Sequence, residues 1–563
     1  MFKTLIAQIT SFSPKRLGQH NLRLLTRFLI VMVLMIITYS ITFHVLMEWE
    51  GQQHSWVTGF YWTLTVMSTL GFGDITFETD VGRLFSIVVL LSGTLFMLVL
   101  LPFTFIEFFY GPWMNEQATG RAPRRLPANA EGHVLLTSYD AVTSTLIPSL
   151  KQYNYRYALL VPDVDEALRL HDEGISVVVG ALDDPQTWQC ARVEKAALVA
   201  STSNDVTNTT VALTVRGQAQ DLPVITTASD EASIDILNLA GSDHVLRLEE
   251  MIGTSFAHRT VGCDALCHVI GELDELLIAE ATAHSTPLVG KTLKESRLRE
   301  RMGITVVGIW ERGHYEPARP DLVIHDHAVL LLAGTKEHLA NYDEFFCIYN
   351  VSIAPVVILG GGRVGRATAR GLAARDVDYR IVEMLPERIR DPKKYVLGNA
   401  ADLAVLEQAG IRETSSVIIT THEDDMNVYL TVYCRQLRPN IQIQSRATHK
   451  RTVATLHRAG ADSVLSYASM GASAVTSFLK RGKIFTVAEG LNAFEVRVPK
   501  ALAGRTVAQS GIRERTGCSV VATQKDNKIH ALPGPEEVLQ QGTEIILIGT
   551  VEAEKRFLEI FGA

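Results

Sequence analysis

The sequence predicts an α-helical membrane domain fused to two repeated α/β modules, each with a doubly wound parallel sheet and a smaller α+β unit. Three observations support this fold class. Two uncharged apolar runs flank a glycine-rich segment near the start of the chain. Stretches of the remaining sequence recur after roughly 215–220 residues, which indicates a duplicated module. Within each copy, short apolar strands alternate with helical stretches, a pattern typical of parallel sheets covered by helices.

The two apolar runs are each long enough to cross a lipid bilayer. Residues 28–47 and 84–106 contain no Lys, Arg, Asp or Glu. A helix rises about 1.5 Å per residue, so either run spans a hydrocarbon core of about 30 Å. The first run is too long for the apolar part of a usual signal peptide, and no small-residue cleavage site follows it. We therefore expect a multi-pass protein of the cell (inner) membrane.

Charged residues predict the orientation of these two helices. Residues 1–27 carry five basic and no acidic residues, whereas residues 48–82 carry five acidic and no basic residues. Three further arginines, Arg121, Arg124 and Arg125, follow the second run. Because basic residues stay on the cytoplasmic side, we expect both termini in the cytoplasm and the 48–82 loop outside.

The loop between the runs has the character of a re-entrant segment. Residues 54–68 are apolar and aromatic, long enough for a short helix but too short to span. Residues 69–73 (TLGFG) would then be non-helical backbone at membrane depth, which survives only where protein buries it or water lines it. Glycine permits dihedrals that let successive carbonyls point the same way, and several copies around an axis would stack oxygen rings for a bare cation.

This segment resembles the TVGYG selectivity filter of potassium channels, in their two-transmembrane form. The resemblance makes K⁺ the permeant ion, and it assigns filter roles to Thr69, Leu70, Gly71, Phe72 and Gly73. Leu70 and Phe72 depart from the pattern but keep the carbonyl ligands; Phe72 lacks the hydroxyl that would brace the filter. Gly93, twenty residues past Gly73, matches the gating hinge of the inner helix. The alternative is a glycine-rich hairpin turn between two anchors.

A duplication fills the rest of the chain. "AGSDHVL" at 240–246 recurs as "AGADSVL" at 459–465, and "LVGKTLKESRLRERMG" at 288–303 recurs as "LAGRTVAQSGIRERTG" at 502–517. The two modules resemble RCK domains (regulators of potassium conductance) in tandem. We expect a cytoplasmic N-terminus at 1–27, a pore domain at 28–108, a linker at 109–131, Rossmann-like subdomains with their hinge helices at 132–271 and 353–482, and C-terminal subdomains at 272–350 and 483–563.

The second module contains a G-x-G-x-x-G turn, Gly360 to Gly365, between a predicted strand and a predicted helix. Glycines let the backbone approach a pyrophosphate, and a helix N-terminus favours its negative charge. Glu383 ends the next strand, where it could accept ribose hydroxyls and repel a 2′-phosphate. The sequence thus predicts a site for NAD or ADP/ATP, formed by Gly360, Gly362, Arg363, Val364, Gly365, Glu383, Thr421, His422, Glu423 and Arg446. The alternative is a degenerate turn that binds nothing.

The first module lacks this turn. Residues 138–143 (SYDAVT) take its place, and Asp140 stands where the second glycine would be, so we assign no nucleotide there. Some RCK domains bind divalent cations, and the resemblance suggests Ca²⁺ at acidic residues near the expected cleft: Asp183, Asp184, Asp205, Asp230 and Glu231. The alternative is that these are solvated surface acids.

Together these features predict a homotetrameric, ligand-gated, potassium-selective channel rather than an enzyme. In RCK channels, a cytoplasmic gating ring opens or closes the pore when a ligand binds. A membrane-tethered NAD-dependent oxidoreductase is the alternative, and a poorly selective cation channel is a third reading. A net charge of −8 argues against nucleic acid as a partner.

Overall fold

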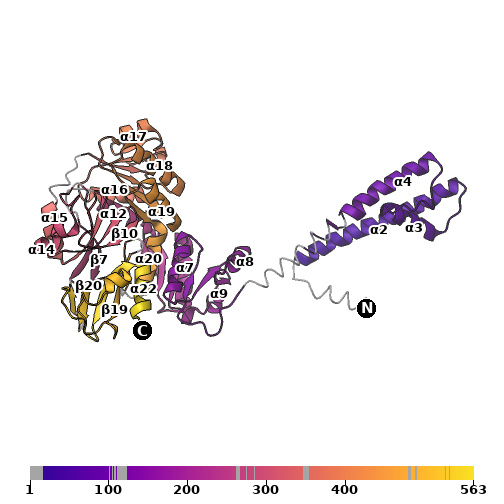
Figure 1. The fold of residues 1–563 in the computed structure, drawn as a ribbon. Helices are drawn as coiled ribbons and strands as arrows, with labels where there is room; N and C mark the ends of the chain where they lie inside the picture. The colour runs from indigo at the N-terminus through magenta and orange to yellow at the C-terminus, as the bar shows by residue number, and fades with distance from the viewer. Residues whose placement is uncertain are drawn as a thin grey trace. The chain divides into compact units, whose positions relative to one another are not determined.

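The structure is a computed structural model that describes residues 17–562 apart from 101, 104–105, 107–109, 111–122, 261–266, 274, 285, 347–353, 480–483, 489–490, 526–527 and 532. It comprises two compact units, Met1–Ala122 and Pro123–Ala563 (Figure 1). Most of the predicted linker at 109–131, and the basic residues Lys3, Lys15 and Arg16, lie outside the described residues.

The first unit is a small helical domain. Its elements are α2 (Leu17–Trp49), α3 (Trp56–Met67), α4 (Asp80–Gly93) and the π-helix η1 (Thr94–Leu100). Two stretches, Thr26–Trp49 and Asp80–Leu100, are long and apolar enough to cross a membrane. The short α3 packs against both α2 and α4, and Phe43, Trp62 and Met67 lie in their shared core. The helix expected over 54–68 is therefore present as α3, which begins after its N-cap, Ser55.

The second unit contains two copies of the same pair of sheets. The six-stranded parallel sheets have the orders β3-β2-β1-β4-β5-β6 and β14-β13-β12-β15-β16-β17. Their strands are β1 (Val134–Leu136), β2 (Tyr157–Val161), β3 (Val177–Val179), β4 (Leu198–Ser201), β5 (Val224–Thr227), β6 (His244–Leu246), β12 (Val356–Leu359), β13 (Tyr379–Glu383), β14 (Tyr395–Leu397), β15 (Ser416–Ile419), β16 (Gln442–Ala447) and β17 (Ser463–Ser466). Strands β1, β2 and β12 are buried along their whole length, as expected for sheets with both faces covered.

Each parallel sheet is followed by a five-stranded antiparallel sheet, in the orders β10-β9-β11-β8-β7 and β18-β19-β22-β20-β21. The strands are β7 (Cys267–Leu273), β8 (Leu276–Thr282), β9 (Thr305–Glu311), β10 (His314–Pro317), β11 (Val329–Gly334), β18 (Ile484–Ala488), β19 (Leu491–Arg497), β20 (Ser519–Lys525), β21 (Lys528–Ala531) and β22 (Glu544–Thr550). The accompanying helices are α13 (Leu293–Ser296), α14 (Leu298–Met302), α15 (Lys336–Phe346), α21 (Ile512–Thr516) and α22 (Val551–Phe561). The expected α+β units are thus present in both copies.

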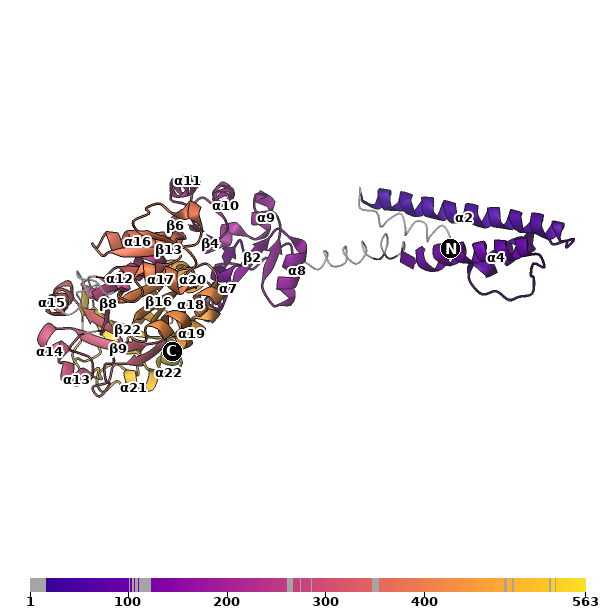
Figure 2. The same cartoon turned by 90° about the horizontal axis from the view of Figure 1, so that it is seen from above.

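The helices around the parallel sheets connect the two modules. They are α7 (Ala141–Gln152), α8 (Val164–Asp172), α9 (Pro185–Cys190), α10 (Asp205–Gln218), α11 (Ser233–Leu239), α12 (Leu248–Arg259), α16 (Arg363–Ala373), α17 (Leu403–Ala409), α18 (Asp424–Leu437), α19 (Lys450–Ala459) and α20 (Tyr467–Leu479). The last helix of each sheet packs on the first helix of the other, α12 on α16 and α20 on α7 (Figure 2). Small residues allow this approach: a Cβ on Gly253 would lie 2.4 Å from the Ala367 Cβ. The two modules consequently share hydrophobic cores.

Polar contacts repeat along with the strands. Asn208 and Asn427 each donate a side-chain N–H to a carbonyl of the neighbouring strand, and Arg216 and Arg435 each form an ion pair with an aspartate. The second member of each pair lies 219 positions after the first. This spacing confirms the duplication at the level of individual side chains.

Candidate functional site

The loop after α3 has an alternating backbone. Thr69, Gly71 and Gly73 have positive φ values of 63°, 46° and 71°, whereas Leu70 and Phe72 do not. Left-handed backbone is costly for a threonine, so its presence here marks a conformation that the surroundings impose. When residues with positive and negative φ alternate, successive carbonyl groups point to the same side of the backbone. A line of carbonyl ligands requires this arrangement.

Two side chains of α3 form hydrogen bonds with the residues that follow this loop. The Tyr61 hydroxyl donates to Asp74 Oδ2 at 3.0 Å, and the Trp62 indole N–H donates to the Ile75 carbonyl at 3.2 Å. The Tyr61 ring also stacks on Phe72, with ring centroids 6.3 Å apart. These hydrogen bonds hold the two residues that follow the loop against α3, and the sequence analysis did not identify them.

Gly93 lies where the second membrane-spanning helix contacts α3. A Cβ on Gly93 would lie 2.4 Å from the Met67 Cα, so only glycine fits this contact. The α-helix ends at Gly93 and continues as the π-helix η1. Such changes of helical winding frequently occur at functional positions.

The glycine-rich turn of the second module joins β12 to α16. Gly360 has φ +107°, which a side chain would strain, and a Cβ on Gly365 would lie 1.9 Å from the Gly360 carbonyl oxygen. Gly362 caps α16 without a side-chain hydrogen bond, and a Cβ there would meet nothing within 4 Å. The N-terminus of α16 thus faces open space, as a phosphate-binding turn requires.

Glu383 lies directly against this turn. One carboxylate oxygen accepts the Gly361 N–H at 2.8 Å and the other accepts the Leu385 N–H at 2.9 Å, in a side chain that is almost fully buried. The carboxylate therefore fixes the turn itself, a role that the sequence analysis did not assign. Its predicted contact with a ribose stays a prediction.

Residues after β15 and on β16 lie at the carboxyl ends of the strands, at the same edge of the sheet as the glycine-rich turn. Thr420 donates to the Gly360 carbonyl at 2.9 Å, and Asn427 bonds both Thr421 and the Arg446 carbonyl. The Arg446 side chain is buried, its Nε has no hydrogen-bond partner, and its guanidinium lies 5.6 Å from the Tyr467 ring centroid. Burial lowers the pKa of Arg446, so an anion in the cleft would stabilise this cation.

The other predicted contacts have different surroundings. Arg363 is exposed and lies 3.8 Å from Glu249 of the first module, a neighbour that the sequence analysis missed. Val364 is buried in the core, so it supports the turn through packing. His422 accepts a hydrogen bond from Thr448 through its carbonyl, and Glu423 caps α18.

In the first module, the equivalent helix N-terminus is occupied by the chain itself. Asp140 Oδ1 accepts the Thr143 N–H at 2.8 Å, and the Thr143 hydroxyl accepts the Asp140 N–H at 2.8 Å, forming a capping box on α7. A carboxylate at this position fills the place that a phosphate would take.

The predicted divalent-cation residues serve structural contacts. Asp184 caps α9, Asp205 accepts the N–H groups of Ser229 and Asp230, and Glu231 lies 3.7 Å from Arg247. Among the residues that the structure describes, no three His, Cys, Asp or Glu side chains form a group able to hold a metal ion. The Ca²⁺ site at Asp183 and these residues stays a prediction.

Three families match the chain in the order of its domains. Residues 29–109 match the family described as "Ion channel". Residues 134–248 and 356–467 match the TrkA-N domain, and residues 278–346 and 493–562 match the TrkA-C domain. The TrkA-N and TrkA-C domains together make up an RCK module.

Known proteins agree with this assignment. The solved structure "GsuK channel bound to NAD" is 36% identical, covers 96% of this chain and 99% of its own, and has a TM-score of 0.59. "Potassium channel protein 1" of Methanocaldococcus jannaschii is 28% identical over 220 residues, which is 36% of this chain and 66% of that relative. "Probable potassium channel protein 2" of the same organism is 26% identical over 224 residues, again 36% of this chain and 65% of the relative. The matches thus span just under two thirds of these two curated relatives.

The relatives, the family matches and the fold agree on one assignment. The chain belongs to the two-transmembrane potassium channels that carry tandem RCK domains.

Proposed function

We propose that four copies of this chain form a potassium-selective pore whose opening is controlled by an adenine nucleotide bound in the second module. One chain supplies one line of carbonyls, so closed rings of oxygen require a cyclic assembly. The alternating φ values at Thr69, Gly71 and Gly73 support the filter role of this loop.

One observation supports the nucleotide site: a Cβ on Gly362 at the N-terminus of α16 would meet nothing within 4 Å, and Arg446, at the carboxyl end of β16 in the same sheet, is buried with an unpartnered Nε. A pyrophosphate would bring negative charge to both. The GsuK structure bound to NAD supports the choice of an adenine dinucleotide. Glu383 is buried against the turn, and Arg388, 3.8 Å from it, is half-exposed, so an added 2′-phosphate would meet a fixed carboxylate whose charge is only partly offset; we therefore propose NAD or ADP rather than NADP.

The proposed membrane arrangement has both termini and the two RCK modules on the cytoplasmic side of the inner membrane. The five basic residues before the first span and the five acidic residues between the spans support it. We also propose that the nucleotide is a regulatory ligand and is not consumed. The smaller α+β units repeat in both modules, which favours an architectural role over that of a dedicated substrate domain.

Single-channel recording in a planar bilayer tests the proposal. NAD added to the cytoplasmic face of the wild-type channel should change open probability, whichever its sign. Gly362→Asp should remove that response while current without ligand remains, because the aspartate would occupy the phosphate position as Asp140 does in the first module. A Gly362→Asp channel that responds to NAD like the wild type would refute the site, and formation of NADH from NAD with an added substrate would refute the regulatory role.

A further inference from the structure

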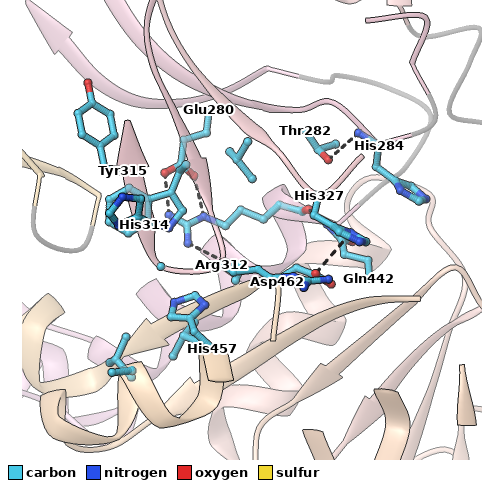
Figure 3. A pocket seen from close by; sticks show the side chains of 18 of the residues that line it. Glu280, Thr282, His284, Arg312, His314, Tyr315, His327, Gln442, His457 and Asp462 are labelled. Atoms are coloured by element: carbon cyan, nitrogen blue, oxygen red, sulfur yellow. Dashed lines mark hydrogen bonds and ion pairs between the residues drawn. The ribbon is translucent and has the colours of Figure 1, made fainter. Parts of the chain in front are cut away.

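A cavity lies away from the glycine-rich turn, between the antiparallel sheet of the first module and the parallel sheet of the second. Its volume is about 770 Å³, within the range of small-molecule sites. Gln442, at the start of β16, lines it, whereas Arg446, near the end of the same strand, is not among its lining residues. The cavity and the proposed nucleotide site therefore lie toward opposite ends of this strand. Figure 3 shows Glu280 and His314 on one side of the cavity and His457 on the other.

The β9–β10 hairpin forms one wall of this cavity. Its tip, Arg312-Gly313, has φ values of 45° and 82°, a turn that favours Asn and Gly. A Cβ on Gly313 would lie 2.5 Å from the His457 ring, so the tip contacts α19 of the second module closely. The hairpin turn thus fixes the backbone of Arg312 at the cavity wall.

Three of the four carboxylates that line the cavity have a partner, and for two of them the partner is an arginine. The pairs are Glu280 with Arg259 at 2.8 Å, Asp462 with Arg435 at 2.8 Å, and Asp326 with His284 at 3.0 Å. Three lining cations, Arg312, Lys450 and Arg458, have no carboxylate partner among the described residues, and Arg458 donates to the Thr455 hydroxyl at 3.1 Å. Among the residues that the structure describes, the exposed Glu552 is the one lining carboxylate without a partner. The lining itself contains four basic and four acidic side chains, and Arg435, which lies outside the lining, pairs with Asp462, so the local balance is one positive charge.

The remaining walls supply flat rings and neutral hydrogen-bonding groups. Trp310 lines the cavity, and the rings of His258 and His268 stack 4.6 Å apart. Burial, together with the charge of Arg259, lowers the pKa of His268 to about 3, so this imidazole is neutral at physiological pH. Planar side chains of this kind favour a ligand with a planar ring.

We propose that this cavity binds a phosphate-bearing small molecule with a planar group, held by Arg312, Lys450 and Arg458. Guanidinium and ammonium groups are the donors that proteins use for phosphate, and these three have no carboxylate partner that would compete with it. A ligand here would contact the first module through the hairpin and the second module through α19. The site is separate from the nucleotide cleft and does not depend on it.

Calorimetry on the full chain tests this site with inorganic pyrophosphate as the probe. The Gly362→Asp background excludes binding at the glycine-rich turn. In that background we compare Arg312→Asn/Lys450→Gln with the charge-matched control Lys500→Gln/Arg505→Gln, whose residues are exposed cations outside the cavity. Asparagine tolerates the left-handed conformation, so the hairpin turn is preserved while the charge is lost.

We expect pyrophosphate to bind in the Gly362→Asp background, with at least tenfold weaker affinity in the cavity variant and less than a twofold change in the control. Equal melting temperatures of the two variants establish that folding is intact. Absence of pyrophosphate binding in the Gly362→Asp background would overturn the proposal. Equal weakening in the cavity and control variants would also overturn it, because the binding would then reflect surface charge alone.

Discussion

The geometry of the turn that joins β12 to α16 predicts different effects on stability for alanine substitutions at Gly362 and Gly365. In Gly365→Ala, the added Cβ would lie 1.9 Å from the Gly360 carbonyl oxygen and 2.9 Å from the Thr420 hydroxyl. Real Cβ atoms keep at least about 3.0 Å from such neighbours, so α16 and the turn must separate by about 1 Å. In Gly362→Ala, the added Cβ meets nothing within 4 Å, and the φ of −66° suits any residue.

The expected effects follow from this contrast. Overpacking of a tight contact costs about 1–3 kcal/mol, so Gly365→Ala should lower the melting temperature by about 2–12 °C. Gly362→Ala should have the same melting temperature as the wild type. Both variants should bind NAD at least tenfold more weakly, because the first displaces the turn and the second places a methyl group where the pyrophosphate would approach.

Thermal unfolding of the full chain and calorimetry with NAD measure the two effects separately. Loss of affinity in both variants with loss of stability in Gly365→Ala alone is the expected result. If Gly365→Ala melted and bound NAD like the wild type, the close packing of the turn would not exist as described, and the argument for the site would fail with it.

Three further predictions concern other parts of the chain. Gly73→Ala forces a side chain onto φ +71°, so reversal potentials under bi-ionic conditions should show lost potassium selectivity or no current at all. Light scattering of the detergent-solubilised protein should give the mass of four chains. A measured mass of one or two chains would contradict the proposed four-chain pore. Asp140→Ala removes the cap of α7 and should destabilise the first module by about 1 kcal/mol, measured as a lower melting temperature, while calorimetry finds unchanged NAD affinity.

Much of the site could be predicted because its requirements are local. The glycines of the turn, the strand before it and the acidic residue at the end of the next strand lie within 28 positions of one another, from Val356 to Glu383. In a parallel sheet those strand ends meet at one edge, so the proximity of Glu383 to the turn follows from the fold. Its hydrogen bond to Gly361 did not follow, because the sequence does not fix which donor a buried carboxylate accepts.

Features that depend on packing between distant segments could not be predicted. Glu249 reaches Arg363 because α12 packs on α16 of the other module, and the cavity is lined by residues from both modules. The second apolar run gave no sign of the π-helix from Thr94, because a change of winding leaves a uniformly apolar pattern unaltered. A signal for Asn427 was present: its counterpart, Asn208, lies 219 positions earlier and makes the equivalent hydrogen bond.

The capping box on α7 gives the first module an anion that it can never release. Because Asp140 is covalently attached beside the helix N-terminus, its effective concentration there is independent of any ligand in the cell. The helix N-terminus of the first module is thus always filled, whereas the proposed site of the second module would alternate between empty and filled as nucleotide levels change. In the proposed four-chain assembly, four of the eight equivalent helix N-termini would therefore respond to the nucleotide, and the other four would not.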